Sequence, residues 1–297
     1  MDVSIIILSY NTSRLTKKCV ESVFSSVETS EDFTAEVIVL DNASTDSSVK
    51  MLKFFEKNHP SAVNFKLLAS KENLGFAKGN NRAVQQATSE NILFLNSDIE
   101  VVDNAISLFV SWFNESHYSI AGAHLVFGDG KIQPSAGRFY SLPIAFFALF
   151  LKGDSWGASR FSPRSPMSVD WVSGACLLIK KHVFERVNGF DENIFMYWEE
   201  VDLQYKARQL SYTTGFYPYA QFIHHEGKSS NSRTYPILRV FEGYLYFYEK
   251  HYSPLQLNIL RYMLKLKAIT SLMIGRLIKN RYLVETYTQA YEMVKMD

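Results

Sequence analysis

The chain has 297 residues, with 31 Lys and Arg against 30 Asp and Glu, so its formal net charge is +1. This length is sufficient for one large domain or for one domain with an appendage. The balanced charge argues against a nucleic-acid partner, which would require a basic excess on one face. The two cysteines, Cys19 and Cys176, both lie in apolar surroundings. We expect them to be buried thiols in a reducing compartment, not a disulfide.

Neither a signal peptide nor a membrane span is expected. The N-terminal Met-Asp-Val-Ser lacks a basic region, and the apolar run behind it ends at Tyr10. The longest apolar run elsewhere, Ile144–Leu151, is too short to cross a bilayer. The sequence therefore predicts a cytoplasmic protein.

The first hundred residues alternate between predicted strands and helices. Apolar segments predict strands at 3–10, 36–40, 64–69 and 92–95, and the first of them is rich in β-branched residues. Apolar spacings of three and four predict helices between them, at 15–27, 49–55 and 80–87, with residues 73–79 as a glycine-containing loop. This order predicts an α/β fold with a mostly parallel, doubly wound sheet.

Beyond residue 98 the alternation is less regular. Helices are expected at 105–113, 199–210 and 235–252, and strands at 169–179 and within 212–223. Glycine and proline crowd residues 128–168, which are expected to form loops around one apolar segment at 144–151. A loop of this length is usually a binding or lid element.

The C-terminal region, residues 253–297, differs from the rest. Between Pro254 and Arg281 there are six basic residues and no acidic one, interleaved with Leu257, Leu260, Leu264, Ile269, Leu272 and Ile278. This pattern predicts a basic amphipathic helical segment that lies on an anionic membrane or packs against a partner. The alternative is a docked C-terminal helix with a solvated basic face.

Polar residues close three of the predicted strands: Ser9-Tyr10-Asn11, Asp41-Asn42 and Asn96-Ser97-Asp98. Ligands of parallel sheets bind beyond the carboxyl ends of the strands, so these groups are candidate nucleotide contacts. Asp41 could accept a hydrogen bond from a base N–H or a ribose hydroxyl, and Asp98 could hold a divalent cation against a phosphate. Alternatively, Asp41 and Asn42 are turn and cap residues.

The segment Asn73–Asn81 carries two glycines four residues apart, Gly75 and Gly79. Such glycines permit close backbone approach to a ligand, and a following helix N-terminus favours negative charge. Asn73, Gly75 and Lys78 are therefore further candidate nucleotide contacts. The segment lacks the Gly-x-Gly-x-x-Gly pattern of dinucleotide-binding folds.

Two polar clusters lie further along the chain. Acidic residues gather among aromatics from Asp191 to Asp202, including Glu199 and Glu200. A carboxylate enclosed by the side chains of Tyr197 and Trp198 would be shielded from water and have a raised pKa, which suits a general base. A helix N-terminus also attracts acids for structural reasons. The second cluster, His224–Ser230, could bind a metal or phosphate, although a single His is more often structural.

Taken together and in this order, the motifs resemble glycosyltransferase family 2, which has the GT-A fold, and most of all its bacterial rhamnosyltransferase-type members. The matching segments are Val3–Asn11, Asp41–Asp46, Asn73–Ala77, Leu95–Asp98, Gly174-Ala175, Gly189–Glu192, Glu199–Leu203 and His224–Ser229. The resemblance covers about residues 1–250.

The resemblance implies an inverting transfer of a sugar from a nucleotide-diphosphate donor to a hydroxyl of a polysaccharide or lipid-linked glycan, with dTDP-rhamnose as a donor candidate. It implies a divalent metal, Mn²⁺ or Mg²⁺, held by Asp98 and His224. It places the base at Glu200, with Glu199 or Asp191 as alternatives. Two positions depart from the family pattern: Asn96 stands where many members have Asp, and Glu199-Glu200 replaces a Glu-Asp pair.

The implied organisation is a GT-A domain over residues 1–252 followed by the C-terminal helical region. Residues 1–100 would bind the nucleotide and residues 101–252 the acceptor. A protein of this kind would work at the inner face of the membrane if residues 254–281 make peripheral contact. Two alternatives remain: a nucleotidyltransferase, disfavoured because Ser9–Thr12 is not a glycine-rich basic loop, and a non-catalytic sugar-nucleotide-binding protein.

Overall fold

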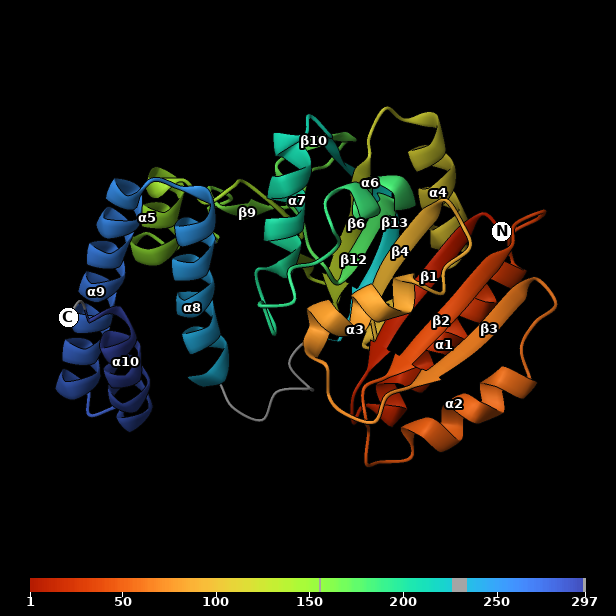
Figure 1. The fold of residues 1–297 in the computed structure, drawn as a ribbon, viewed down its shortest axis with the longest axis horizontal. Coiled ribbons are helices and arrows are strands. Elements are labelled where there is room, and N and C mark those ends of the chain that lie inside the picture. Colours follow the sequence, from red (N-terminus) through yellow and green to blue (C-terminus); the bar gives the residue numbers. More distant parts are fainter. Residues whose placement is uncertain (155, 226–233, 296–297) are drawn as a thin grey trace. The chain divides into compact units, whose positions relative to one another are not determined.

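The computed structural model describes residues 1–154, 156–225 and 234–295 (Figure 1). The chain divides into two compact units. The first comprises Met1–Gly137, Phe161–Phe195 and Glu199–Ser229, and the second comprises Arg138–Arg160, Met196–Trp198 and Ser230–Asp297. The predicted functional division at residue 252 remains a prediction.

The first unit begins with the predicted alternation of strands and helices. In chain order these elements are β1 (Val3–Ser9), α1 (Ser13–Glu28), β2 (Ala35–Asp41), α2 (Ser48–Lys57), β3 (Val63–Ala69), α3 (Gly75–Val84) and β4 (Asn91–Asn96). Helix α3 starts at Gly75, so the predicted loop at 73–79 and helix start at Asn80 are wrong. The Asn73 side chain accepts a hydrogen bond from the Gly75 N–H at 3.0 Å and supports this earlier start.

The remaining elements of this unit vary more in length, from two-residue strands such as β7 to the 11-residue strand β13. They are β5 (Ile99–Val101), α4 (Ala105–Glu115), β6 (Ile120–Phe127), β7 (Ile132–Gln133), β8 (Ala136–Gly137), β9 (Arg160–Phe161), β10 (Met167–Val169), β11 (Trp171–Val172), β12 (Cys176–Lys180), α6 (Lys181–Arg186), α7 (Glu199–Gln209) and β13 (Thr214–His224). The predicted strand at 169–179 is two strands separated by a turn at 173–175. Strand β6 was not predicted, and residues 128–168 contain short strands and a helix where loops were expected.

The main sheet has the order β10-β13-β6-β12-β4-β1-β2-β3, with β5 beside β13 and β7 beside β6. Strands β3, β2, β1 and β4 are parallel, and β13 is parallel to β6. Strand β12 runs antiparallel to both of its neighbours, β4 and β6. The predicted α/β class and mostly parallel sheet are therefore confirmed.

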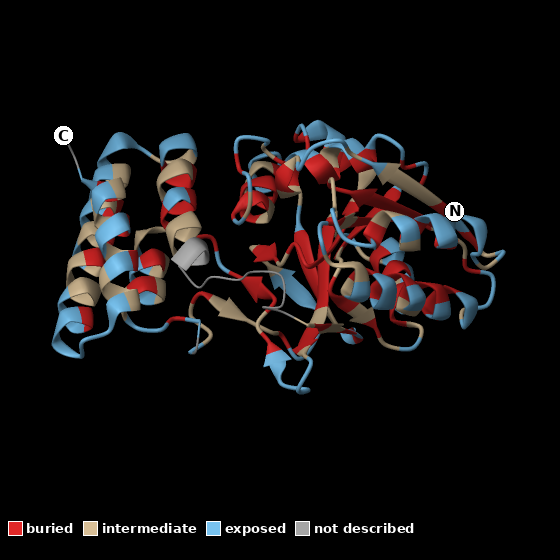
Figure 2. Ribbon diagram, turned by 90° about the horizontal axis from the view of Figure 1, so that it is seen from below, coloured by how far each residue is buried: buried red, intermediate tan, exposed pale blue. Residues whose placement is uncertain are grey.

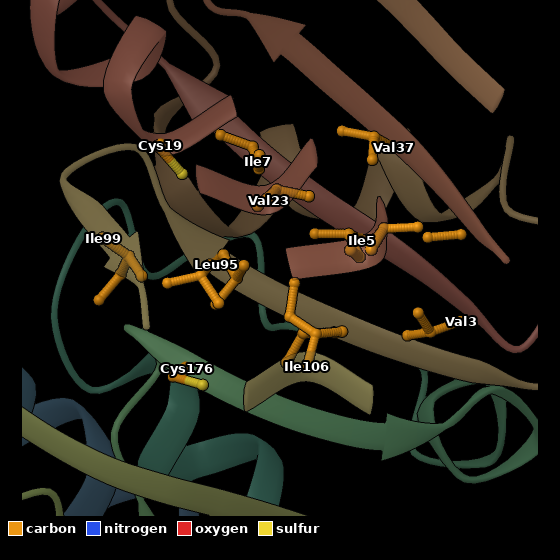
Figure 3. Close-up of a cluster of buried hydrophobic side chains, with 14 of the residues drawn as sticks. Val3, Ile5, Ile7, Cys19, Val23, Val37, Leu95, Ile99, Ile106 and Cys176 are labelled. Atoms are coloured by element: carbon orange, nitrogen blue, oxygen red, sulfur yellow. The ribbon is translucent and has the colours of Figure 1, made fainter. Parts of the chain in front are cut away.

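Both faces of this sheet are covered by helices. On one face, strand residues such as Ile5 and Leu95 pack against Cys19 and Val23 of α1 and Ile106 of α4 (Figure 3). On the other, strand residues pack against side chains of α3, α6 and α7. Figure 2 shows the buried residues concentrated in the strands and on the inner sides of the helices.

Both cysteines are free and buried, as predicted. Burial raises the pKa of the Cys19 and Cys176 thiols, so neither behaves as a ready nucleophile.

The second unit is built mainly from helices: α5 (Leu142–Phe150), α8 (Thr234–His251), α9 (Pro254–Leu277) and α10 (Arg281–Val294). Helix α9 packs against α5, α8 and α10. It begins with a capping box, in which Ser253 and Gln256 satisfy each other's backbone N–H groups. Within the described ranges, we find no helix with the length and apolarity needed to cross a bilayer.

Candidate active site

The polar ends of the first strands lie at one edge of the sheet. In the parallel register Ser9 is opposite Asp41, and Leu8 is opposite Asn96. The expectation that these strand ends open onto the same edge is therefore confirmed. The Ser9 hydroxyl lies 2.9 Å from that of Thr16 and links β1 to α1.

Asp41 is the most deeply buried acid at this edge. Its side chain is 1% exposed, and its Oδ2 accepts a hydrogen bond from the Ser44 N–H at 2.9 Å. Its Oδ1 is buried and has no hydrogen-bond partner among the described residues. A buried carboxylate oxygen without a donor is costly, which makes Asp41 a candidate to receive a donor from a ligand.

The asparagines at this edge bind the loops around them. Asn11 has a positive φ of 51°, and its Oδ1 accepts a hydrogen bond from the Thr45 N–H at 2.7 Å. Asn42 accepts one from the Leu74 N–H and donates one to Asn73 Oδ1, both at 2.8 Å. These side chains shape the edge by fixing the loops that follow the strands.

Gly75 and Lys78 lie on α3 beside the same edge. Gly75 has φ of +74°, and a Cβ there would stand 2.7 Å from the Phe195 ring. The Phe76 N–H also donates to the Phe195 carbonyl at 3.0 Å. Glycine is therefore required for packing against residue 195 as well as for its backbone conformation. Lys78 is exposed.

Asp98 and His224 meet because β5 pairs with β13, which places His224 opposite Ile99. The Asp98 Oδ1 lies 3.2 Å from the His224 Nε2, and both side chains are buried. The His224 Nδ1 lies 3.0 Å from the Gln133 Oε1. An amide oxygen only accepts, so Nδ1 carries the hydrogen of this bond. In the neutral ring, Nε2 then directs a lone pair at the Asp98 carboxylate.

This arrangement fits a divalent cation. Two electron-rich atoms that face each other in a buried site need a proton or a cation between them. The carboxylate oxygen and imidazole nitrogen suit Mn²⁺, and the bond from Gln133 is the outer support usual for a ligating histidine. Among the described side chains, no third His, Cys, Asp or Glu joins the pair. Glu226 and Ser229, in the other half of the predicted histidine motif, fall outside the described residues.

Helix α7 begins with two adjacent glutamates whose surroundings differ. Glu199 is 5% exposed, and its Oε2 has no hydrogen-bond partner within the described structure. Burial, followed by the charge of Glu200, raises the pKa of Glu199 well above its ordinary value of 4.5. Burial and the neighbouring charge therefore favour the protonated form of Glu199.

Glu200 lies beside the turn between β11 and β12. A Cβ at Gly174 would stand 3.4 Å from the Glu200 Cβ. The next residue, Ala175, accepts a hydrogen bond from the Asn96 N–H at 3.0 Å. One short turn therefore connects Glu200 to the strand end that carries Asn96.

Gln204 was not predicted from the sequence, yet it holds this part of the site together. Its Oε1 accepts from the Val172 N–H, and its Nε2 donates to the Val172 carbonyl, both at 2.8 Å. The same Nε2 donates to the Glu200 carbonyl at 2.9 Å. The amide thus fixes α7 against β11, one helical turn from Glu200. A single glutamine in a helix gives no sequence signal for such a contact.

Asp191, the third candidate base, serves its own turn in this structure. Its Oδ1 accepts hydrogen bonds from the Asn193 N–H at 3.0 Å and the Asn193 Nδ2 at 2.9 Å.

The two residues before α7 have unusual backbone conformations. Tyr197 and Trp198 have φ of 67° and 79°, a left-handed region that bulky residues rarely adopt. In the second unit, the Trp198 ring packs 4.8 Å from Tyr140 and 4.4 Å from Tyr244, between ring centres. Gly243 is required beneath it, because a Cβ there would collide with the indole. Packing of the indole holds this strained segment in place.

A family model decides the broad identity. The model of glycosyl transferase family 2 matches residues 4–170, more than half of the chain. The chain belongs to glycosyltransferase family 2. The predicted enzyme class is confirmed, and the nucleotidyltransferase alternative is set aside.

The relatives that it resembles include rhamnosyltransferases. An N-acetylglucosaminyl-diphospho-decaprenol L-rhamnosyltransferase of Mycobacterium tuberculosis is 27% identical over 232 residues, which cover 71% of this chain and 73% of that protein. The rhamnosyltransferase WbbL of Escherichia coli is 28% identical over 174 residues, covering 54% of this chain and 66% of that protein.

Solved structures support the fold. A mannosyltransferase from Pyrobaculum calidifontis, solved with GDP-Man and Mn²⁺, has a TM-score of 0.60 at 16% identity. The match covers 97% of this chain and 73% of that one. The predicted GT-A architecture is thus confirmed.

Glu199→Gln tests the electrostatics at the start of α7. The raised pKa means that the folded protein keeps a proton that the unfolded chain loses above its ordinary pKa of 4.5. This contribution to stability is fully present below that pH and is lost as the pH rises through the raised folded pKa. Gln cannot ionise, so Glu199→Gln should melt above wild type at neutral pH, with the difference shrinking in acid.

Thermal unfolding between about pH 4 and 8 measures this, with Glu185→Gln, an exposed position on α6, as the matched control. A Tm difference between Glu199→Gln and wild type that does not change with pH would contradict the assignment.

Proposed function

We propose that the chain transfers a sugar, with inversion, from a nucleotide-diphosphate donor to a hydroxyl of a polysaccharide or lipid-linked glycan. The observation that carries the proposal is the juxtaposition at one sheet edge of a buried acceptor atom, Asp41 Oδ1, with the facing pair Asp98 and His224. The turn at Gly174 brings Glu200 to the same region.

Each group has a chemical part in this proposal. Asp41 accepts a hydrogen bond from the base or ribose of the nucleotide. Asp98 and His224 would hold a divalent cation, Mn²⁺ or Mg²⁺. This ion would supply positive charge that stabilises the leaving diphosphate. Such ions usually complete their coordination with phosphate oxygens and water, which suits a site with two ligands among the described residues.

Glu200 acts as the general base. The acceptor hydroxyl oxygen forms a bond to the anomeric carbon while the bond from that carbon to the diphosphate oxygen breaks. The diphosphate leaves with the bonding electrons, and the hydroxyl proton passes to the Glu200 carboxylate. Attack opposite the leaving group inverts the configuration. Glu199 is the weaker candidate because it is buried, whereas Glu200 is half-buried and therefore more open to an acceptor hydroxyl.

The donor and acceptor follow from the relatives only as proposals. We infer dTDP-rhamnose as a donor because two relatives are named as rhamnosyltransferases, and a lipid-linked acceptor because one acts on a decaprenol diphosphate. An enzyme with such an acceptor would work in the cytoplasm at the inner face of the membrane, with peripheral contact through residues 254–281.

Asp98→Asn tests the metal site. The change keeps the side-chain shape but removes the charge, so Mn²⁺-dependent affinity for dTDP should fall at least about tenfold, equivalent to about 1.4 kcal/mol. Calorimetry with dTDP, in Mn²⁺ and in EDTA, measures this. The matched control is Asp129→Asn, which removes an exposed carboxylate paired with Lys131. An undiminished Mn²⁺-dependent affinity in Asp98→Asn would remove the residue from the site.

Glu200→Gln tests the base. Removing a general base typically lowers the rate by about 10²–10⁴-fold, so nucleoside diphosphate release in the presence of lipid-linked acceptors should fall by at least about 10²-fold. Protection by dTDP against thermal unfolding should be kept, because the base does not hold the donor. Glu185→Gln is the control.

Full activity in Glu200→Gln would move the base to another residue. If wild type releases no nucleoside diphosphate from any donor in a sugar-nucleotide panel, yet is protected by one of them, the chain is the non-catalytic sugar-nucleotide-binding alternative.

A further inference from the structure

Helix α9 has an exposed apolar face on a side that the sequence analysis did not single out. The residues predicted to form its apolar side include Leu260 and Leu264, which are fully buried against the other helices of the second unit, together with Ala268. The opposite side is also apolar. We call it the outer stripe: Leu255, Ile259, Tyr262, Leu266, Met273 and Leu277, which are 70%, 40%, 63%, 52%, 64% and 84% exposed.

The spacing shows that the outer stripe is one continuous surface. Its members follow one another at intervals of four, three, four, seven and four residues. At 3.6 residues per turn, these intervals keep all six side chains on one side of the helix along its whole length. Soluble proteins rarely expose a contiguous apolar strip of this kind unless it meets another surface.

Charge indicates what that surface is. Lys265 and Arg276 each follow a stripe residue by three positions, Tyr262 and Met273, and therefore lie beside the stripe. No acidic residue occurs between positions 254 and 281. The nearest following acid, Glu285, is already paired with Arg281. Neither Lys265 nor Arg276 forms an ion pair with another described residue, so the edge of the stripe carries positive charge.

A second copy of the chain is the main alternative occupant, because the spacing is close to that of a coiled-coil seam. Pairing two outer stripes would bring the Lys265 and Arg276 edges of both copies to one interface. Stable helix pairs normally place opposite charges beside the seam. This helix offers only positive ones, so self-pairing is opposed by repulsion, whereas an anionic surface is attracted.

We propose that the outer stripe of α9 is a docking surface for anionic phospholipid, with its apolar side chains entering the acyl boundary and Lys265 and Arg276 meeting the headgroups. An interfacial helix binds in this way without crossing the bilayer. The role of this docking surface rests on the proposed function, because a lipid-linked acceptor would be presented at a membrane surface. Lipid binding itself does not depend on catalysis.

Vesicle flotation of the full chain tests the proposal. Wild type should float with phosphatidylcholine vesicles that contain phosphatidylglycerol, and at least about tenfold less with pure phosphatidylcholine. Leu266→Gln/Met273→Gln should lose the binding by a similar factor, and Lys265→Gln/Arg276→Gln should lose its dependence on phosphatidylglycerol. Phe54→Gln, which changes an exposed apolar residue on α2, is the matched control and should bind as wild type.

Three results would overturn the proposal. The first is that wild type does not bind anionic vesicles. The second is that Leu266→Gln/Met273→Gln binds them as well as wild type, and the third is that wild type fails to bind vesicles but is a dimer in light scattering that this double variant makes monomeric.

Protection by dTDP against thermal unfolding, measured on the same variants, separates this proposal from the enzymatic one. If wild type fails to bind vesicles but is protected by dTDP, only the lipid-docking proposal fails. If wild type binds vesicles but releases no nucleoside diphosphate from any donor, only the proposed catalysis fails.

Discussion

The parallel register of β1, β2 and β4 fixes where the polar groups of the candidate site lie. Each strand is buried along almost its whole length and ends in polar residues at its carboxyl end, with Ser9 opposite Asp41 and Leu8 opposite Asn96. A slip of one residue would turn each side chain to the other face of the sheet, so the buried pattern holds the register. The position of Asp98 then depends on β4, and that of His224 on the β5–β13 pair that follows it.

Several groups at this edge are costly to the fold. Asp41 buries a carboxylate oxygen without a donor, Glu199 is buried next to a second acid, and Asp98 faces a histidine. A chain selected for stability alone would not gather such groups, because each costs free energy when its partner is missing. Their concentration where strands, turn and helix α7 converge is what a binding site for a charged ligand requires.

The sequence was informative wherever a local pattern determined the structure. Apolar segments identified β1, β2, β3 and β4, and polar residues after β1, β2 and β4 identified the edge. Contacts between distant segments have no local signature. The antiparallel pairing of β12 with β4 and the contact of the Gln204 amide with Val172 join residues far apart in the sequence and exist only in the tertiary fold. Gln133, which supports His224, is equally invisible before folding.

Helix α9 shows a different limit. Its sequence is apolar on two opposite sides, so periodicity alone cannot say which one is buried. The packing of α8 and α10 selects the Leu260 and Leu264 side and leaves Leu266 and Met273 outside. A loop was predicted at the start of α3 because of the glycines at 75 and 79. In the structure Gly75 is the first residue of the helix, and a glycine is needed there because of the close contact with Phe195.

The most direct measurement of the central claim is a crystal structure of the protein with dTDP and Mn²⁺. The account predicts that the nucleoside lies within hydrogen-bonding distance of Asp41 Oδ1, and that the ion is bound by Asp98 and His224 against the diphosphate. A nucleotide bound elsewhere on the chain, or an ion that touches neither Asp98 nor His224, would contradict it.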